Sequence, residues 1–387
     1  MQIQRISPAI PQCNPAALVS ELRPELNDCI ERVLDGGRYI LGPEVEAFEA
    51  EWASWCGTEH AVGCANGTDA LELILRSLDL PAGSRVLAPS HTAVATIAAI
   101  VRSGHRPMLA DVDPCTFGLD PLSAARCIDA ATVDRDPVRA LIAVHLYGHP
   151  VDLNALQELC SSHGIPLVED GSQAHGARWC GERVGSFGVA AGFSLYPTKN
   201  LGALGDAGVI TCRTSEHSSR LKRLRQYGWE QPAISEEPGV NSRLDPLQAA
   251  ILRVKLPLLE AHNRHRQAVA EVYRANLTQT SGLQLPAPAD ERSEPVYHQF
   301  VIQLPSQHRD EVRTRLSDLG VGTLLHYPKA AHQMPAYQGA ARDPAGLSAT
   351  EELLPRIISL PMGTHVSLSQ AVEVAECLVR VMQEAGA

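Results

Sequence analysis

The chain has 387 residues, of which 44% are hydrophobic and 20% are charged, the composition of a folded globular protein rather than a disordered one. Its 44 acidic and 33 basic residues give a formal net charge of −11. This balance argues against a general nucleic-acid binder or a protein bound to an anionic membrane, because both need a basic face.

The cysteines and the N-terminal stretch bear on cellular location. No two of the ten cysteines form a C-x-x-C pair, and they are spread thinly along the chain, as reduced thiols are in a cytosolic protein. The N-terminal stretch MQIQRISPAIPQCNPAAL has no apolar core of the signal-peptide type. The longest apolar run, residues 93–101, is too short to span a bilayer. We therefore expect a cytoplasmic protein with no membrane partner.

Between residues 60 and 212, short β-rich runs alternate with helical patterns. The expected strands are 85–88, 140–144, 165–169, 189–195 and 209–212, and the expected helical segments are 93–102 and 152–163. This alternation predicts an α/β fold with a mainly parallel sheet and crossover helices. In open sheets of this kind, ligands bind beyond the carboxyl ends of the strands.

A second pattern begins near Asn241. An apolar helical face runs through residues 247–254 and ends at Pro257. The expected elements after it are a helix at 258–277, a loop at 285–295, a strand at 297–304, a helix at 309–319, a strand at 321–326 and a helix at 369–384. We therefore divide the chain into a large domain of residues 1–250 and a small α+β C-terminal domain of residues 251–387.

The first candidate motif for chemistry is NGTD at residues 66–69, just before an amphipathic helix. Gly67 allows close approach of the backbone, and Thr68 adds a hydroxyl. The free N–H groups and positive dipole end of such a helix suit a phosphate. The alternative is a plain helix cap formed by Thr68 or Asp69, which is far commoner in proteins.

Two further candidates lie at or after strand ends. Asp170, in VEDGSQAHG, ends an apolar strand, where a carboxylate would hold a ligand cation or a protonated ring nitrogen. The alternative is an exposed strand-end acid. Lys199, in GFSLYPTKNLGALGD, follows a buried strand and enters a glycine-rich loop. A single lysine is usually only solvated, but a phosphate anchor, a carboxylate and an amine together are the parts that a pyridoxal phosphate (PLP) site needs.

At these residues the sequence resembles a known family. The motifs NGTDAL, VHLYGHPVDL, EDGSQAHGA and SLYPTKNLGALGD are similar to those of the DegT/StrS group of PLP-dependent sugar aminotransferases, which have PLP fold type I. GVNSRLDPLQAAIL, YHQFVI and HYPKAAHQMPAY extend the resemblance over about residues 38–361. The resemblance implies pyridoxal 5′-phosphate as cofactor and a homodimer with active sites shared between subunits.

Specific roles follow from the resemblance. It makes Lys199 the Schiff-base lysine and Asp170 the partner of the pyridine nitrogen, and it puts Gln173 near the ring hydroxyl. The residues implied to hold the phosphate are Gly67, Thr68 and Ser194, with Asn241 from the other subunit. The residues implied to lie near the substrate are Tyr39, Tyr196, His326 and Tyr327.

The sequence departs from the family pattern next to the cofactor. Family members usually carry an aromatic residue, stacked on the ring, where this chain has Ala93. Ring stacking must then be weaker or come from elsewhere, and we include His91 among the cofactor-binding residues as a substitute. Ser172 stands where alanine is common, and Ala207 where glycine is common. None of these changes removes a required catalytic group.

The remaining histidines carry no separate prediction of chemistry. His145 and His149 are four residues apart, but Gly148 and Pro150 break the helix that would align them, so we expect no metal site. We expect His175 to order its loop rather than to catalyse.

The predicted function is therefore transfer of an amino group from an amino acid, by resemblance L-glutamate, to a keto-deoxysugar of a nucleotide sugar. The resemblance is greatest to enzymes acting on dTDP-3-keto-6-deoxyhexoses, which make amino sugars for antibiotics or polysaccharides. A 4-keto sugar or a cyclitol ketone stays open as the acceptor. A dehydratase of the same group is disfavoured, because that branch replaces the lysine with histidine. A catalytically silent regulator need not retain Lys199, Asp170 and the phosphate site together.

Overall fold

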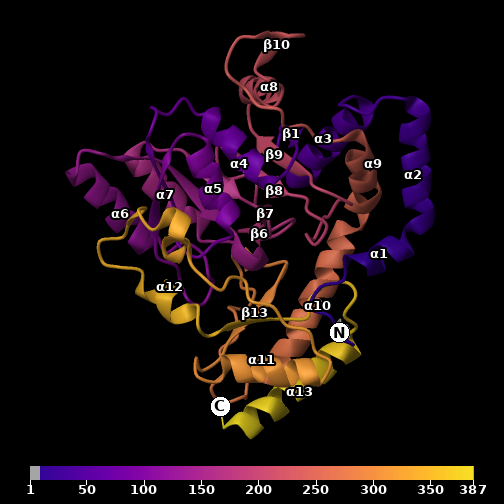
Figure 1. Cartoon of the computed structure of the whole chain (residues 1–387), viewed down its shortest axis with the longest axis vertical. Coiled ribbons are helices and arrows are strands. Elements are labelled where there is room, and N and C mark those ends of the chain that lie inside the picture. Colours follow the sequence, from indigo (N-terminus) through magenta and orange to yellow (C-terminus); the bar gives the residue numbers. More distant parts are fainter. Residues whose placement is uncertain (1–8, 387) are drawn as a thin grey trace, which may run out of the picture.

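The computed structural model describes residues 9–386. Its centre is an eight-stranded sheet in the order β1-β9-β8-β5-β4-β2-β3-β14 (Figure 1). The strands are β1 (His60–Cys64), β2 (Arg85–Pro89), β3 (Arg106–Ala110), β4 (Val138–Val144), β5 (Leu167–Asp170), β8 (Ala190–Ser194), β9 (Gly208–Cys212) and β14 (Ala341–Arg342). β9 is antiparallel to both of its neighbours, and the other pairs are parallel. The predicted α/β fold with a mainly parallel sheet is confirmed.

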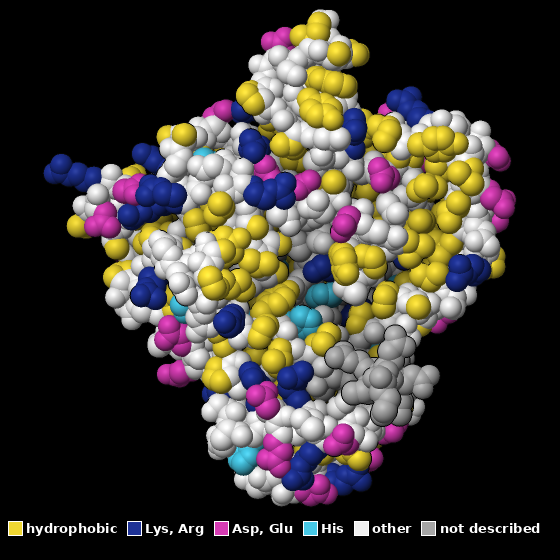
Figure 2. Space-filling model, viewed as in Figure 1, with side chains coloured by type: hydrophobic (Ala, Val, Ile, Leu, Met, Phe, Trp, Pro, Cys, Tyr) yellow, Lys and Arg dark blue, Asp and Glu magenta, His cyan; other side chains and the backbone are white. Residues whose placement is uncertain are grey.

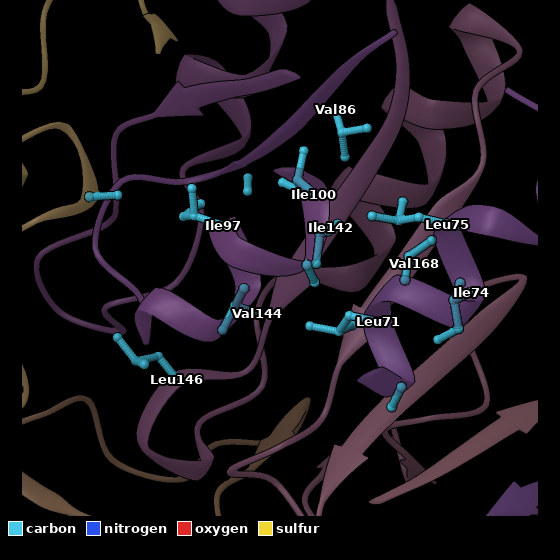
Figure 3. Close-up of a cluster of buried hydrophobic side chains, with 14 of the residues drawn as sticks. Leu71, Ile74, Leu75, Val86, Ile97, Ile100, Ile142, Val144, Leu146 and Val168 are labelled. Carbon is cyan, nitrogen blue, oxygen red and sulfur yellow. The ribbon is translucent and has the colours of Figure 1, made fainter. Parts of the chain in front are cut away.

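Helices cover both faces of this sheet, because successive strand residues point to opposite sides. Val86 packs with α4 (Gly67–Arg76) and α5 (Val94–Arg102), whereas Leu87 packs with α6 (Pro121–Val133) and α7 (Leu153–His163). Figure 3 shows the first of these clusters, in which leucines and isoleucines of the two helices meet β-branched residues of the strands. Both faces of the strands are therefore buried, which leaves the strand ends as the place for a polar site.

The N-terminal helices form a further layer that the sequence patterns did not predict. These are α1 (Pro15–Glu21), α2 (Arg23–Gly36) and α3 (Pro43–Cys56), and α2 and α3 pack against α9 (Pro246–Lys255). α8 (Ser215–Leu224) leads to a projecting hairpin of β10 (Trp229–Gln231) and β11 (Ile234–Ser235), seen at the top of Figure 1. β6 (Arg178–Trp179), β7 (Glu182–Arg183) and β12 (Ser293–Glu294) form a small separate sheet.

A second hydrophobic core lies in the lower part of Figure 1. It is built from α10 (Leu259–Leu277), β13 (Phe300–Gln303), α11 (Arg309–Asp318), β15 (Ile357–Leu360) and α13 (Leu368–Ala385), with β13 and β15 antiparallel. Ile10, from the other end of the described chain, packs in the same core. α12 (Ser348–Leu353) lies between the two regions in sequence and packs its Leu353 into the core of the large sheet.

The strand expected at residues 321–326 is wrong. Only two isolated bridges form there, Val321 with Ile10 and Leu324 with Ser359. A strand needs a neighbour that pairs with it over several residues, and the edge of β15 reaches this segment at a single residue. The chain then continues into the polar cavity described below, where His326 lies. The sequence patterns also missed β15 itself.

The division of the chain at residue 250 stays a prediction. That position falls inside α9, and β14 returns from the C-terminal part to the edge of the large sheet. Residues beyond 250 thus contribute to both cores. Within residues 9–386, no helix is both long and apolar enough to cross a membrane.

Candidate active site

A polar cavity of about 460 Å³ opens at the carboxyl ends of the parallel strands. Its walls come from the segments that follow β1, β2, β4, β5 and β8, where backbone and side chains are free of sheet packing. Figure 2 shows a hollow near the middle of the molecule with histidine side chains in it. The predicted site residues that line the cavity are Gly67, Thr68, Asp170, Gln173, Ser194, Tyr196, Lys199, His326 and Tyr327.

The first residues of α4 offer unused backbone donors to this cavity. Asn66 is the N-cap: its Oδ1 accepts from the N–H of Asp69 at 2.9 Å, and its carbonyl accepts from Ala70 at 3.0 Å. Within the described residues, the N–H groups of Gly67 and Thr68 have no acceptor. The N-cap of α4 is therefore Asn66, rather than Thr68 or Asp69. The positive end of this helix still presents two free donors, the N–H groups of Gly67 and Thr68.

Gly67 also determines how closely the helix approaches β8. A Cβ atom at this position would lie 2.6 Å from the Cβ of Ser194 and 2.9 Å from its Cα, far inside normal contact. The hydroxyl of Ser194 is thus brought beside the two free N–H groups. This cluster of donors, with no carboxylate in it, fits a phosphate.

Asp170 is held in one orientation at the end of β5. The Oγ1 of Thr96 donates to its Oδ2 at 2.8 Å, and the N–H of Ser172 donates to its Oδ1 at 3.1 Å. Asp170 is 5% exposed and Thr96 is fully buried. A carboxylate has about four lone-pair positions, so acceptor capacity remains for a ligand. Thr96 lies 74 residues from Asp170, and no signal in the sequence linked the two.

Lys199 lines the same cavity, and it is close enough to Asp170 for the two charges to act on each other. Burial lowers the pKa of Lys199 from 10.5 to about 8, although the negative charge of Asp170 acts in the opposite direction. The cost of removing an ammonium group from water is the cause. At a pKa of about 8, roughly a tenth to a fifth of the amine is neutral between about pH 7 and pH 7.4, far more than at the ordinary pKa of 10.5, and the neutral form is the one that a nucleophile or base requires.

Gln173 bonds to two segments that are far from it in the sequence. Its Oε1 accepts from the N–H of Tyr147 at 2.6 Å, and its Nε2 donates to the hydroxyl of Tyr327 at 3.0 Å. The hydroxyl of Tyr147 donates in turn to the carbonyl of His326. Burial raises the pKa of Tyr327 to about 12, which keeps that phenol protonated. These bonds fix the segment that carries His326 and Tyr327 against the large sheet.

His91 is not among the residues that line the cavity, and its role as a cofactor-binding residue stays a prediction. Its ring is fully buried, its Nε2 lies 2.7 Å from the hydroxyl of Tyr147, and burial lowers its pKa to about 4. Thr92 and Ala93 face the cavity in its place. In this structure the His91 ring contacts Tyr147.

Tyr39 and Asn241 also lie outside the cavity. The Tyr39 side chain is 52% exposed and its hydroxyl donates to the carbonyl of Leu34 at 3.2 Å. Asn241 is exposed at an isolated bridge with Gln226. Their predicted roles stay predictions.

Several cavity residues were not predicted as site residues. Asn66, Asp206, His298 and Gln299 line the cavity. All four lie inside motifs of the sequence, NGTD, LGALGD and YHQF. These motifs could therefore have been used to predict them as site residues. Gln299 accepts from the side-chain amide of Gln12, and burial holds the pKa of His298 well below its usual range.

His145 and His175 support neighbouring loops. The Nε2 of His145 lies 3.2 Å from the Oε2 of Glu169, a buried carboxylate that also accepts from the N–H groups of Gly185, Phe187 and Gly188. The Nε2 of His175 lies 2.9 Å from the carbonyl of Ser194, which agrees with the ordering role expected for it. The described part of the chain contains no group of three or more His, Cys, Asp or Glu side chains arranged to hold a metal ion.

Comparison with known proteins gives consistent matches over nearly the whole chain. A family model described as the DegT/DnrJ/EryC1/StrS aminotransferase family matches residues 20–379. A dTDP-3-amino-3,4,6-trideoxy-alpha-D-glucose transaminase of Streptomyces venezuelae is 43% identical over 96% of each chain. A UDP-N-acetyl-3-dehydro-alpha-D-glucosamine 3-aminotransferase of Acidithiobacillus ferrooxidans is 39% identical over 97% of this chain and 98% of its own. The crystal structure of S. venezuelae DesV in complex with a ketimine intermediate superimposes with a TM-score of 0.91, at 42% identity over 97% of this chain and 98% of DesV.

Proposed function

This chain belongs to the DegT/DnrJ/EryC1/StrS aminotransferase family, and we propose that it moves an amino group from L-glutamate to the 3-keto group of a dTDP-linked 6-deoxyhexose. It is a nucleotide-sugar aminotransferase with the α/β fold of type I, as the resemblance implied. The two relatives described above act, by their names, at position 3 of sugars that carry different nucleotides. Position 3 is thus better supported than the dTDP carrier.

The arrangement of the cavity supports pyridoxal 5′-phosphate as the cofactor. The N–H groups of Gly67 and Thr68 and the hydroxyl of Ser194 would hold its phosphate. When bound, the cofactor supplies an aldehyde carbon for the amine and a ring that draws electrons from the carbon losing its proton. Asp170 would accept the pyridinium N–H, because an anionic partner within a few ångströms favours the protonated ring nitrogen.

Lys199 is the residue of this chain that moves protons in the proposed reaction. Its Nζ takes and returns a proton readily near neutral pH, because burial has lowered its pKa to about 8. It would take the proton from the substrate carbon and deliver it on the same side of the cofactor. Thr96 and the N–H of Ser172 keep the carboxylate of Asp170 aimed in one direction during this transfer.

The proposal also covers the residues that would bind the substrate and the assembly of the chain into a homodimer. Tyr196, His326 and Tyr327 line the cavity and would contact the sugar or the donor amino acid. We propose a homodimer in which Asn241 and Tyr39 act at the site of the neighbouring subunit. A cytoplasmic location and a role in amino-sugar biosynthesis for an antibiotic or polysaccharide remain part of this proposal.

The observation that carries the proposal is the meeting of Lys199, Asp170 and the N-terminus of α4 in one cavity. These groups come from segments far apart in the sequence. A regulator without catalysis has no need for a lysine whose pKa is lowered toward neutrality beside a carboxylate fixed by two hydrogen bonds.

The test is a reverse transamination assay. The purified enzyme, loaded with PLP, is mixed with 2-oxoglutarate and one member of a panel of dTDP- and UDP-linked amino sugars and aminocyclitols, and keto products are detected by mass. We expect conversion of 3-amino dTDP sugars, and none with the Lys199→Ala enzyme as control. Conversion of 4-amino sugars or of aminocyclitols in preference to 3-amino sugars would overturn the choice of acceptor.

A further inference from the structure

A row of buried amide and imidazole groups lies next to the loop that carries Lys199. Asn200, the residue after Lys199, is 7% exposed, and Asn263 of α10 is 3% exposed. His298 and His175 complete the row and are also buried. Of these four residues, only His298 lines the active-site cavity. The reaction proposed above gives Asn200 and Asn263 no part.

Asn263 connects the loops that follow β5 and β8. Its Oδ1 accepts from the Nδ2 of Asn200 at 2.9 Å, and its Nδ2 donates to the carbonyl of His175 at 2.7 Å. His175 lies five residues after Asp170, and its ring Nε2 is 2.9 Å from the carbonyl of Ser194. One side chain of α10 is therefore bonded to the segments that carry the amine, the carboxylate and the phosphate-binding hydroxyl of the proposed site.

The acceptors around the two amides determine how each amide is turned. The carbonyl of His175 can only accept, so the nitrogen of Asn263 faces it and the oxygen faces Asn200. The Nδ2 of Asn200 also donates to the carbonyl of Val296 at 3.2 Å. The Oδ1 of Asn200 is thereby turned toward the Nδ1 of His298, 3.2 Å away. It follows that Nδ1 of His298 carries a proton and that Nε2 carries none when the ring is neutral.

The end of the row at the cavity is a neutral acceptor. Burial and the nearby charge of Lys199 hold the pKa of His298 well below its ordinary value, so the ring is neutral near pH 7. Its Nε2 lies 3.5 Å from the side-chain nitrogen of Gln299, which has protons to donate. Both residues line the cavity. The row therefore adds no positive charge beside Lys199.

The backbone next to His175 permits the close contact with Asn263. Gly176 has a φ of +94°, and a Cβ atom there would lie 2.7 Å from the Nδ2 of Asn263 and 2.7 Å from the ring of Trp55. A side chain at residue 176 would force the amide away from the carbonyl of His175. Glycine is therefore required both by the backbone conformation and by the approach of the amide.

Other hydrogen bonds hold the rest of the Lys199 loop. The N–H of Lys199 donates to the carbonyl of Tyr196 at 2.8 Å, and the Nζ of Lys255 donates to the carbonyl of Gly202 at 2.7 Å. Loss of the Asn263 amide leaves both bonds in place. We therefore expect such a loss to displace the residues next to Lys199 rather than to unfold the loop.

We propose that Asn263 is a positioning residue, which sets where the amine of Lys199 lies relative to Asp170 through its bonds to Asn200 and His175. The inference rests on the proposed function, in which Lys199 bonds to the cofactor and moves a proton. A displacement of about 1 Å can slow such a reaction about a hundredfold. Asn263 is not among the residues that line the cavity, so it acts through its two neighbours.

Substitution by leucine tests this role, because leucine is close to asparagine in shape and makes no side-chain hydrogen bond. Cofactor-free enzyme is mixed with PLP, and formation of the Schiff base with Lys199 is followed by absorbance. We expect the Asn263→Leu enzyme to react at least tenfold more slowly than the unchanged enzyme. Asn276→Leu, at an exposed position of the same helix, should react at the normal rate.

The outcomes of this measurement separate the two proposals. Equal rates for the Asn263→Leu and Asn276→Leu enzymes would overturn the positioning role and leave the proposed function standing. An unchanged enzyme that forms no Schiff base with PLP would contradict the proposed function, and the positioning role with it.

Kinetics with L-glutamate as amino donor distinguish positioning from substrate binding. For the Asn263→Leu enzyme we expect kcat to fall at least tenfold while KM for L-glutamate changes less than twofold, because the amine is displaced and the substrate contacts are not. An unchanged kcat would contradict the proposal. A tenfold rise in KM with kcat unchanged would assign Asn263 to substrate binding and would contradict it as well.

Neutron diffraction covers the case in which the Asn263→Leu enzyme fails to fold. Crystals of the unchanged enzyme are grown in heavy water, and the deuterons are located. We expect deuterons on the Nδ1 of His298 and the Nε2 of His175, and the deuterated amide nitrogen of Asn263 facing the carbonyl of His175. A deuteron on the Nε2 of His298 with none on its Nδ1, or an Asn263 amide turned the other way, would refute the proposed arrangement.

Discussion

The role proposed for Asp170 requires its carboxylate to face one direction, and the hydroxyl of Thr96 on α5 provides that restraint together with the N–H of Ser172. Thr96 is fully buried and donates to the Oδ2 of Asp170 at 2.8 Å. A hydrogen bond to a charged group is worth about 1.5–3 kcal/mol, enough to favour one orientation strongly. Thr96 is not among the residues that line the cavity, so we expect it to act as a positioning residue for Asp170.

Replacement of Thr96 by valine tests this role. The change keeps the shape of the side chain and removes the donor, so we expect kcat/KM to fall by about tenfold or more. The absorbance of the bound cofactor should also titrate at a different pH, which a purely structural defect would not produce. Thr96→Ser retains the hydroxyl and should keep most of the activity. A valine variant with normal spectrum and rate would rule out the positioning role.

The reactivity of Lys199 should follow the pKa that burial gives it. In the cofactor-free enzyme, the rate at which an amine reagent modifies Lys199 should be half-maximal near pH 8, because only the neutral form reacts. Subtracting the rate of the Lys199→Ala enzyme isolates this residue from other amines. A midpoint near 10.5 would show that burial does not perturb the amine.

The lowered pKa of Lys199 also affects how the free energy of unfolding depends on pH. Between about pH 8 and pH 10.5, the unfolded chain binds more protons at this position than the folded chain does. The contribution of Lys199 to the free energy of unfolding therefore rises with pH over that window. Below pH 8 the charged amine is a net cost to the fold.

At the scale of secondary structure, the decisive contact is between the first turn of α4 and the end of β8. Gly67→Ala would drive a methyl group to 2.6 Å from the Cβ of Ser194, so helix and strand must separate. We expect the dissociation constant for PLP to rise at least tenfold, since the donors no longer converge on one phosphate. Gly36→Ala is the control, because nothing lies within 4 Å of its added Cβ. Titration with PLP, followed by absorbance, measures the dissociation constant for each of the two variants. Equal dissociation constants for the Gly67→Ala and Gly36→Ala enzymes would contradict the proposed phosphate site.

Elements with strong local patterns were predictable from the sequence. The strands that became β2, β4, β5, β8 and β9 are apolar runs, and the residues at their ends carry the site motifs. Asp170 and Lys199 could therefore be predicted as neighbours. The segment at 321–326 has the same apolar character but lacks a continuous partner strand, which no local pattern reveals.

Contacts between distant segments were not predictable. Thr96 reaches Asp170 only because the first turn of α5 lies close to the end of β5, and a threonine in a helix has many other uses. His91 was assigned to the cavity from its place beside Ala93, but the turn after β2 points its ring toward Tyr147 instead. Side-chain direction in a loop depends on such packing and cannot be derived from sequence spacing.

At the scale of the whole molecule, the proposed shared sites predict complementation between inactive subunits. In a homodimer with Lys199 from one subunit and Asn241 from the other, Lys199→Ala and Asn241→Ala subunits form hybrids with one site unaltered and one doubly altered. Random mixing of equal amounts should then restore about a quarter of the normal activity. Each variant assayed alone is the control. Recovery of no activity after proven subunit exchange would contradict a site completed by Asn241 of the partner.

The bridge between Ile10 and Val321 has a consequence for synthesis of the protein on the ribosome. Ile10 is translated roughly 310 positions before its bridge partner Val321, and the other residues of the second core are spread over residues 269–382. At about 5–20 residues per second, that segment waits roughly 15–60 seconds for its partners. By then every strand of the large sheet except β14 has been translated, so the segment at Ile10 is among the last of the described parts to find its partners.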